Sequence, residues 1–143
     1  STISSCDDTM KSLKDLLVDT KKGIRKEAAW TVSNIAAGST EQIQRVFDTG
    51  QMSVIFDRIG GAEEEEDVAK ELAWVISNAV DSGNEEQRKL IVEAGCVDKL
   101  AGLLTRFNER HFLEALKKFE IFELGREAIA KRGGMDELEK MVT

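Results

Sequence analysis

The sequence contains no proline and no tyrosine among its 143 residues, and its single histidine is His111. The absence of proline removes the residue that most strongly breaks helices. The remaining composition is rich in alanine, leucine, glutamate and lysine, which favour helix. A lone histidine with no partner at ligand spacing offers no basis for a metal site or a catalytic centre. These absences favour an all-α chain without histidine chemistry.

The two cysteines, Cys6 and Cys96, have neither disulfide nor metal-ligand spacing, which fits a reducing compartment. No apolar run approaches the about 18 residues of a membrane span, and the N-terminus has no signal-peptide pattern. No Ser/His/Asp set, phosphate-binding glycine loop or cluster of metal ligands is visible. Gly125, Gly133 and Gly134 are interpreted as helix stops. We therefore expect a protein that is not an enzyme and holds no cofactor or metal.

Charge and composition describe a globular chain the size of one domain. It is 33% charged and 41% hydrophobic, so it has enough apolar residues for a core. The net charge of −7 argues against non-specific binding to nucleic acid and favours basic partners. A purely solubilising role would explain the same acidity equally well.

The chain contains an internal repeat. Ile24 to Gly38 reads IRKEAAWTVSNIAAG, and Val68 to Gly83 reads VAKELAWVISNAVDSG. Each copy has a glutamate, a tryptophan and an asparagine at the same spacing: Glu27, Trp30 and Asn34, then Glu71, Trp74 and Asn78. The offset between the copies is 44 residues at every one of these positions. A fixed period of this length is typical of repeat architectures.

Helical geometry separates two stripes within each copy. A helix turns about 100° per residue, so the Trp, Asn and Glu of one copy lie within about 60° of each other. The aliphatic residues fall on the opposite side: Ile24, Ala28, Val32 and Ile35, and then Val68, Leu72, Ile76 and Ala79. The aliphatic stripe should be buried. Stacked helices would then present the two tryptophans, two asparagines and two glutamates as a ladder on one exposed surface.

Short helices separate the long ones. Ser39 with Gln42, and Asn84 with Gln87, form N-terminal capping patterns, and glycines end the short segments. The acidic run 63–66 is interpreted as a solvated helix start. A third long helix is expected near Asn108, with this buried stripe: Phe112, Ala115, Leu116, Phe119 and Phe122. In this third copy the positions of the glutamate, tryptophan and asparagine are occupied by Glu114, Lys117 and Ile121. The exposed Trp/Asn ladder is therefore expected to stop after the second copy.

The repeating order is therefore short helix, short helix, long helix. Three-helix units of this length predict an armadillo-type fold. We expect one all-α domain over residues 1–143, a right-handed superhelical solenoid of about three to four repeats. Its approximate repeats are residues 9–38, 39–83, 84–124 and 125–143, of which the first and last are partial.

At WTVSN and WVISN the sequence resembles the armadillo repeats of importin-α, the adaptor that carries nuclear localisation signals. The supporting text is IRKEAAWTVSNIAAGSTEQIQRVFDTG, KELAWVISN and EEQRKLIVEAGCVDKL. The resemblance covers about residues 10–105 well. General armadillo proteins need the aliphatic pattern but not this Trp/Asn ladder.

The resemblance implies a signal peptide lying extended in a concave groove, at a major and a minor site. The order of features looks like the C-terminal part of the family, without the major site or the autoinhibitory segment. The residues that would belong to the minor site are Trp30, Asn34, Trp74 and Asn78, with Glu27, Glu71 and Ser33 matching groove positions near them. The resemblance also implies a protein that shuttles between cytoplasm and nucleus. It further implies contacts with a nuclear export factor and a nucleoporin through C-terminal repeats.

The chemistry of the ladder suits a basic peptide. Parallel tryptophans form slots for the methylene stems of lysine or arginine, and each cation over a ring gains roughly 0.5–2 kcal/mol. Asparagines can bond a peptide backbone, and glutamates face the cations, whereas Lys117 would repel them. The alternative is an armadillo scaffold that binds another protein through helix faces, with the tryptophans covered by that partner. A solenoid without terminal capping repeats exposes apolar surface at its ends, so we expect self-association.

Overall fold

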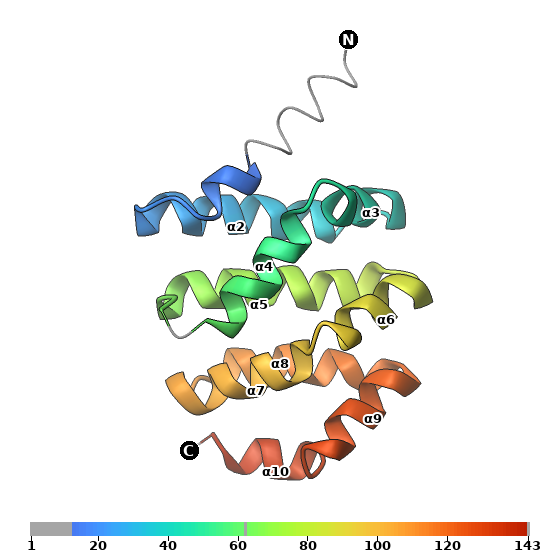
Figure 1. Ribbon diagram of the computed structural model, residues 1–143. Coiled ribbons are helices and arrows are strands. Elements are labelled where there is room, and N and C mark those ends of the chain that lie inside the picture. Colours follow the sequence, from blue (N-terminus) through green and yellow to red (C-terminus); the bar gives the residue numbers. More distant parts are fainter. Residues whose placement is uncertain (1–12, 62, 143) are drawn as a thin grey trace.

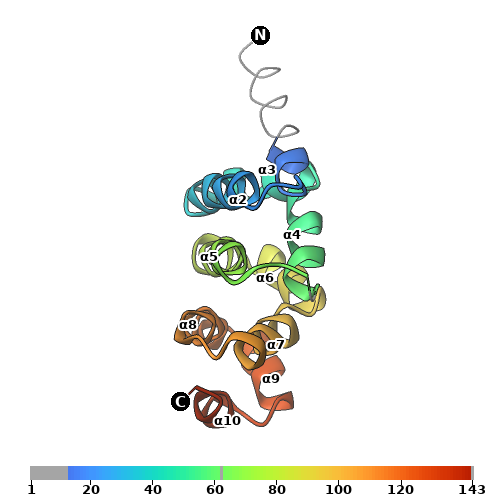
Figure 2. The ribbon, with the colours of Figure 1, turned by 90° about the vertical axis from the view of Figure 1, so that its left-hand side faces the viewer.

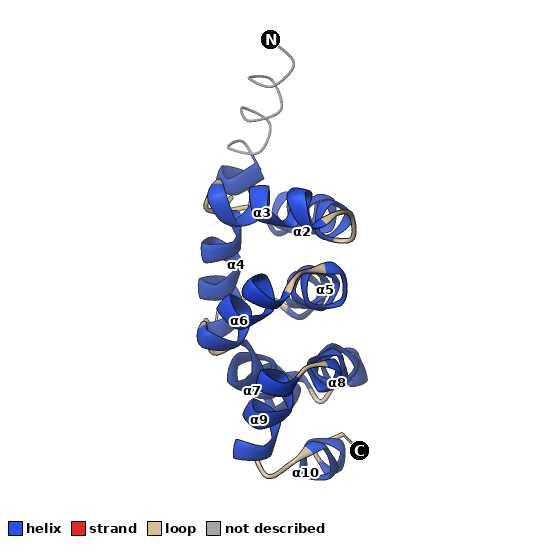
Figure 3. Ribbon diagram, turned by 90° about the vertical axis from the view of Figure 1, so that its right-hand side faces the viewer, coloured by secondary structure: helices blue, strands red, loops and turns tan. Residues whose placement is uncertain are grey.

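The computed structural model describes residues 13–61 and 63–142, and this part of the chain consists of helices joined by short turns (Figure 3). Residues 13–16 are helical, so the predicted helix from Thr9 to Val18 lies partly outside the described residues. The elements that follow are α2 (Lys22–Ala36), α3 (Thr40–Asp48), α4 (Gln51–Gly60), α5 (Glu66–Ser82), α6 (Glu85–Glu93), α7 (Cys96–Phe107), α8 (Arg110–Lys117), the 3₁₀ helix η1 (Lys118–Ile121), α9 (Glu123–Lys131) and α10 (Met135–Lys140). The all-α prediction is confirmed.

Helices α2, α5 and α8 are stacked one after another in chain order and form one layer of the molecule (Figures 1 and 2). Helix α5 packs against α2 on one side and against α8 on the other. Helices α4 and α7 lie in the second layer, and α3, α6 and α9 connect one repeat to the next. The predicted order of short, short and long helix is confirmed for α3–α4–α5.

Both predicted capping patterns are present. The Ser39 hydroxyl accepts a hydrogen bond from the Gln42 amide at 3.2 Å, and the Gln42 side chain accepts one from the Ser39 amide at 2.8 Å. Asn84 and Gln87 make the same reciprocal pair at 2.9 and 3.0 Å. Gln87 also donates to the carbonyl of Thr40 at 2.9 Å, so one cap is tied to the start of the preceding repeat. These caps fix where each repeat begins.

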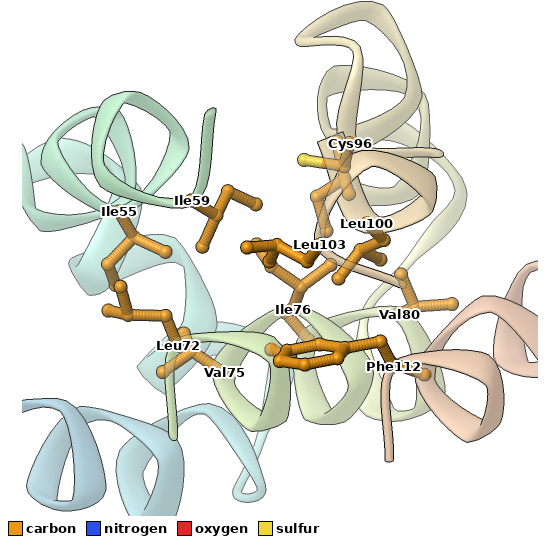
Figure 4. Close-up of a cluster of buried hydrophobic side chains, with 14 of the residues drawn as sticks. Ile55, Ile59, Leu72, Val75, Ile76, Val80, Cys96, Leu100, Leu103 and Phe112 are labelled. Atoms are coloured by element: carbon orange, nitrogen blue, oxygen red, sulfur yellow. The ribbon is translucent and has the colours of Figure 1, made fainter. Parts of the chain in front are cut away.

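The core lies between the two layers. Figure 4 shows its central part, to which α4, α5, α7 and α8 all contribute: Ile55, Ile59, Leu72, Val75, Ile76, Val80, Cys96, Leu100, Leu103 and Phe112. The predicted aliphatic stripe of the second copy is completely buried. In the first copy Ala28 and Val32 are buried, whereas Ile24 and Ile35 are half-buried. The stripe prediction is thus confirmed for the second copy and in part for the first.

The third long helix is shorter than predicted. Helix α8 ends at Lys117, the chain tightens into η1, and Phe122 is extended before α9 begins. Gly125 lies inside α9, so its interpretation as a helix stop is wrong. A Cβ atom at Gly125 would collide with the carbonyl oxygen of Phe119. Glycine is therefore required because α9 crosses close to η1.

Glu64 corrects the interpretation of the acidic run 63–66 as solvated. Its side chain is only 2% exposed. Oε1 accepts from Arg25 of α2 at 3.1 and 3.3 Å, and Oε2 accepts from Arg58 of α4 at 2.9 and 3.1 Å. Glu66 does lie in the first turn of α5, where the helix dipole favours a negative charge. The run thus combines one buried ion-pair centre with an acidic helix start.

Cys96 offers a test of core burial. Burial raises the pKa of its thiol from 9.0 to about 12, and the nearby charge of Lys99 acts in the opposite direction. Only the thiolate is reactive, so the raised pKa alone lowers the reactive fraction near neutral pH by about a thousand-fold. We expect a Cys6→Ser variant to react with an aromatic disulfide reagent at least about 100-fold more slowly when folded than in denaturant. Equal rates in both conditions would contradict this burial.

Candidate peptide-binding surface

Two large aromatic side chains lie exposed at equivalent positions on neighbouring helices. Trp30 of α2 is 55% exposed and Trp74 of α5 is 46% exposed. Six residues on the exposed side of α2 and α5 are here called the Trp–Asn surface: Glu27, Trp30, Asn34, Glu71, Trp74 and Asn78. Large exposed aromatic side chains at equivalent positions of two packed helices are typical of a surface that contacts a partner. The predicted exposure of both tryptophans is confirmed.

A slot of about 240 Å³ lies beside Trp30, and both helices contribute to it. Its lining residues are Gly23, Lys26, Glu27 and Trp30 of α2 and Glu71 of α5. Lys26 is paired with Asp67 at 3.9 Å. Within the described parts of the chain, neither Glu27 nor Glu71 has an ion-pair partner. The slot therefore offers an aromatic wall and two carboxylates without an ion-pair partner, with one lysine beside them, which suits a cation on a methylene stem.

Asn78 links the two long helices. Its side-chain Nδ2 donates to the carbonyl oxygen of Ser33 at 2.9 Å. A primary amide has a second N–H and a carbonyl oxygen, so Asn78 keeps one donor and its acceptor for a ligand. The sequence does not predict this bond, because it joins residues 45 positions apart.

Ser33 lies beneath the Trp–Asn surface. It is 5% exposed, and its hydroxyl donates to the carbonyl of Trp30 at 2.6 Å. Ser77, at the equivalent place in the second copy, is buried in the same way. The hydroxyl of Ser33 is thus bonded to its own helix. Ser33 contributes to the Trp–Asn surface only through its backbone carbonyl oxygen, which accepts the hydrogen bond from Asn78.

His111 of α8 lies against Trp74. Their ring centroids are 5.0 Å apart and the rings meet edge-on at 69°. The Nε2 atom of His111 is 2.9 Å from the carbonyl oxygen of Lys70 on α5. A hollow of about 320 Å³ lies at this junction of α5 and α8, lined by Ala73, Trp74, Ser77, His111, Glu114, Ala115 and Lys118. Nothing in the sequence indicates these contacts, since Trp74 and Lys70 are both distant from His111 along the chain.

The ladder ends at the third repeat. Lys117, in the predicted tryptophan place, pairs with Glu114 and with Glu139 at 3.6 Å each. Ile121, in the asparagine place, lies in η1 and is exposed. This repeat therefore presents a charge-paired surface where the first two present aromatic rings and amides.

Residues 13–61 and 63–142 contain no group of three or more His, Cys, Asp or Glu side chains that could hold a metal ion. In the same part of the chain, no helix has both the length and the apolar character needed to cross a membrane. The surface offers aromatic faces, carboxylates and amides.

Comparison with curated proteins finds similarity to importin subunits alpha. Importin subunit alpha-5 of Arabidopsis thaliana is 39% identical over 100 residues, which are 70% of this chain and 19% of that protein. Importin subunit alpha-6 of the same plant is 45% identical over 92 residues, 64% of this chain and 16% of that protein. The chain is a homologue of importin-α armadillo repeats. No protein-family model matches it.

Solved structures agree with the fold of this importin-α homologue. A designed armadillo repeat protein in complex with the peptide (KR)4 is 31% identical, with a TM-score of 0.78 over 92% of this chain and 55% of that one. Computationally designed armadillo repeat proteins for modular peptide recognition are 28% identical, with a TM-score of 0.67 over 93% of this chain and 51% of theirs. The predicted armadillo fold is confirmed. The homologue spans less than a fifth of the length of the curated relatives it matches.

Proposed function

We propose that this importin-α homologue binds Lys/Arg-rich nuclear localisation signal peptides, in an extended conformation, on the Trp–Asn surface. The observation that carries the proposal is the pair of half-exposed tryptophans on adjacent helices, with the unpaired carboxylates of Glu27 and Glu71 beside Trp30. The similar designed protein in complex with (KR)4 supports it, because that peptide alternates the same two cations. Such binding would give the protein a role in transport between cytoplasm and nucleus.

Each part of the surface has a separate role in binding. The methylene stem of a lysine or arginine lies along the Trp30 indole, and its cation faces Glu27 and Glu71. The amides of Asn34 and Asn78 bond the peptide main chain, whose donors and acceptors are the same in every sequence. The tryptophans and glutamates thus select basic side chains, while the asparagines hold the strand extended. The chain acts as a binding protein rather than an enzyme.

The carboxylates provide the direct test. We expect a Glu27→Gln/Glu71→Gln variant to bind a fluorescent (KR)4 peptide about 10-fold more weakly, since two exposed charge interactions contribute up to about 1 kcal/mol each. Fluorescence anisotropy would give the dissociation constant. Added salt should weaken binding to the unmodified protein and have less effect on the variant.

A matched control separates this effect from net charge. The control variant Glu120→Gln/Glu127→Gln also removes two negative charges, but from exposed positions in η1 and α9. It should leave the affinity for (KR)4 unchanged. A peptide with glutamine at every basic position should not bind. Peptide affinity that is unchanged in the Glu27→Gln/Glu71→Gln variant would favour the alternative function, an armadillo scaffold. In that case an export factor, a nucleoporin or another helical partner would contact other surfaces.

A further inference from the structure

We propose that His111 is a positioning residue of the peptide site, holding the Trp74 indole in place and closing its α8 side to the peptide. This inference rests on the proposed function. It assigns a task to a side chain that stands outside the repeated Glu–Trp–Asn pattern.

The contacts of His111 fix it against α5. A backbone carbonyl only accepts, so the Nε2 atom of His111 must carry the hydrogen that reaches the Lys70 oxygen at 2.9 Å. A salt bridge of 3.5 Å between Lys70 and Glu109 holds the beginning of α8 to the same turn of α5. The imidazole also meets the Phe112 ring at 5.8 Å. With its ring held on these sides, His111 meets Trp74 in one orientation.

The charges around this junction differ from those in the Trp30 slot. Glu114 is shared between Arg110 and Lys117 at 3.6 Å each. Lys118 is paired with Asp81, also at 3.6 Å. The α8 side of Trp74 therefore has no uncompensated carboxylate comparable to Glu27 and Glu71 among the described residues. A peptide cation gains most on the side of Trp74 that faces α2.

The first measurement needs no peptide. In a Trp30→Phe background Trp74 is the only tryptophan, so quenching of its fluorescence by acrylamide reports how far its indole is open to solvent. We expect His111→Gln to raise the quenching constant about twofold, because it removes the ring that covers the α8 side of the indole. Glutamine is the matched replacement, since its amide can still donate to Lys70 but offers no ring to the indole. Equal quenching constants for the two proteins would overturn the contact.

The second measurement joins the contact to peptide binding. With native tryptophans, (KR)4 affinity should be about three- to fivefold lower in His111→Gln than in the unmodified protein, because no ring holds the Trp74 indole in place. Equal affinity in both proteins would overturn the role of His111 and leave the proposed function standing. No peptide binding by the unmodified protein, with folded protein verified by circular dichroism, would overturn both.

Discussion

Replacing both Trp30 and Trp74 with alanine is expected to weaken binding of a (KR)4-type peptide by about 100- to 1,000-fold. Each indole contributes roughly 0.5–2 kcal/mol through its attraction for a cation. Each also covers the methylene stem of that side chain, which adds apolar burial. The sum over two rings is about 3–4 kcal/mol, and each 1.4 kcal/mol is about tenfold in affinity. Both side chains are half-exposed, so their removal leaves little cavity in the core.

Anisotropy titrations of the two single variants and the double variant would measure this loss. The control is Leu90→Ala/Ile121→Ala, which removes two side chains of 43% and 48% exposure from another part of the surface. Its peptide affinity and thermal unfolding should stay close to those of the unmodified protein. If the double tryptophan variant binds as well as this control, the peptide does not lie on the Trp–Asn surface.

The largest expected effect on stability comes from Glu64→Ala. This change is expected to lower the free energy of unfolding by about 3–5 kcal/mol, because it leaves buried Arg25 and half-buried Arg58 without their shared carboxylate. Glu64 connects α2, α4 and the segment before α5, so its loss should loosen the first repeat from the second. The effect is large compared with the about 5–15 kcal/mol that stabilise a typical domain.

Urea unfolding followed by circular dichroism would measure this difference. Glu65→Ala is the matched control. The Glu65 carboxylate also lies near Arg25, at 3.9 Å, but its side chain is 54% exposed. An exposed pair of this kind contributes at most about 1 kcal/mol. Glu64→Gln keeps the shape and some hydrogen bonds, so it should fall between the two. Equal costs at Glu64 and Glu65 would show that the buried ion pairs do not stabilise the fold.

The features predicted correctly are those that a short stretch of sequence specifies. The capping boxes at Ser39 and Asn84 need only two residues three positions apart. The buried stripe of α5 follows from helical periodicity, and so does the exposure of Trp74 on its opposite side. Because the unit repeats, one correctly interpreted copy also gives the second, and the armadillo fold follows.

The features that were missed depend on contacts between distant residues. Glu64 meets Arg25 39 positions away, and His111 meets Lys70 41 positions away. Nothing in the sequence near Gly125 shows that α9 crosses η1 closely, so the sequence predicts a helix stop at a glycine that lies inside a helix. Ser33 shares the helix face of its neighbours by sequence, yet the packing of α5 covers it. The role of the Trp–Asn surface in binding stays a prediction.

The slot beside Trp30 is assembled from two consecutive repeats, with Glu27 and Trp30 from one helix and Glu71 from the next. A single repeat therefore carries only part of such a slot, and in the proposed binding mode the junction between two repeats is the unit of recognition. An array built by duplicating residues 39–83 would gain one slot for each added junction. The length of peptide that it reads would then grow with the number of junctions, always one fewer than the number of repeats.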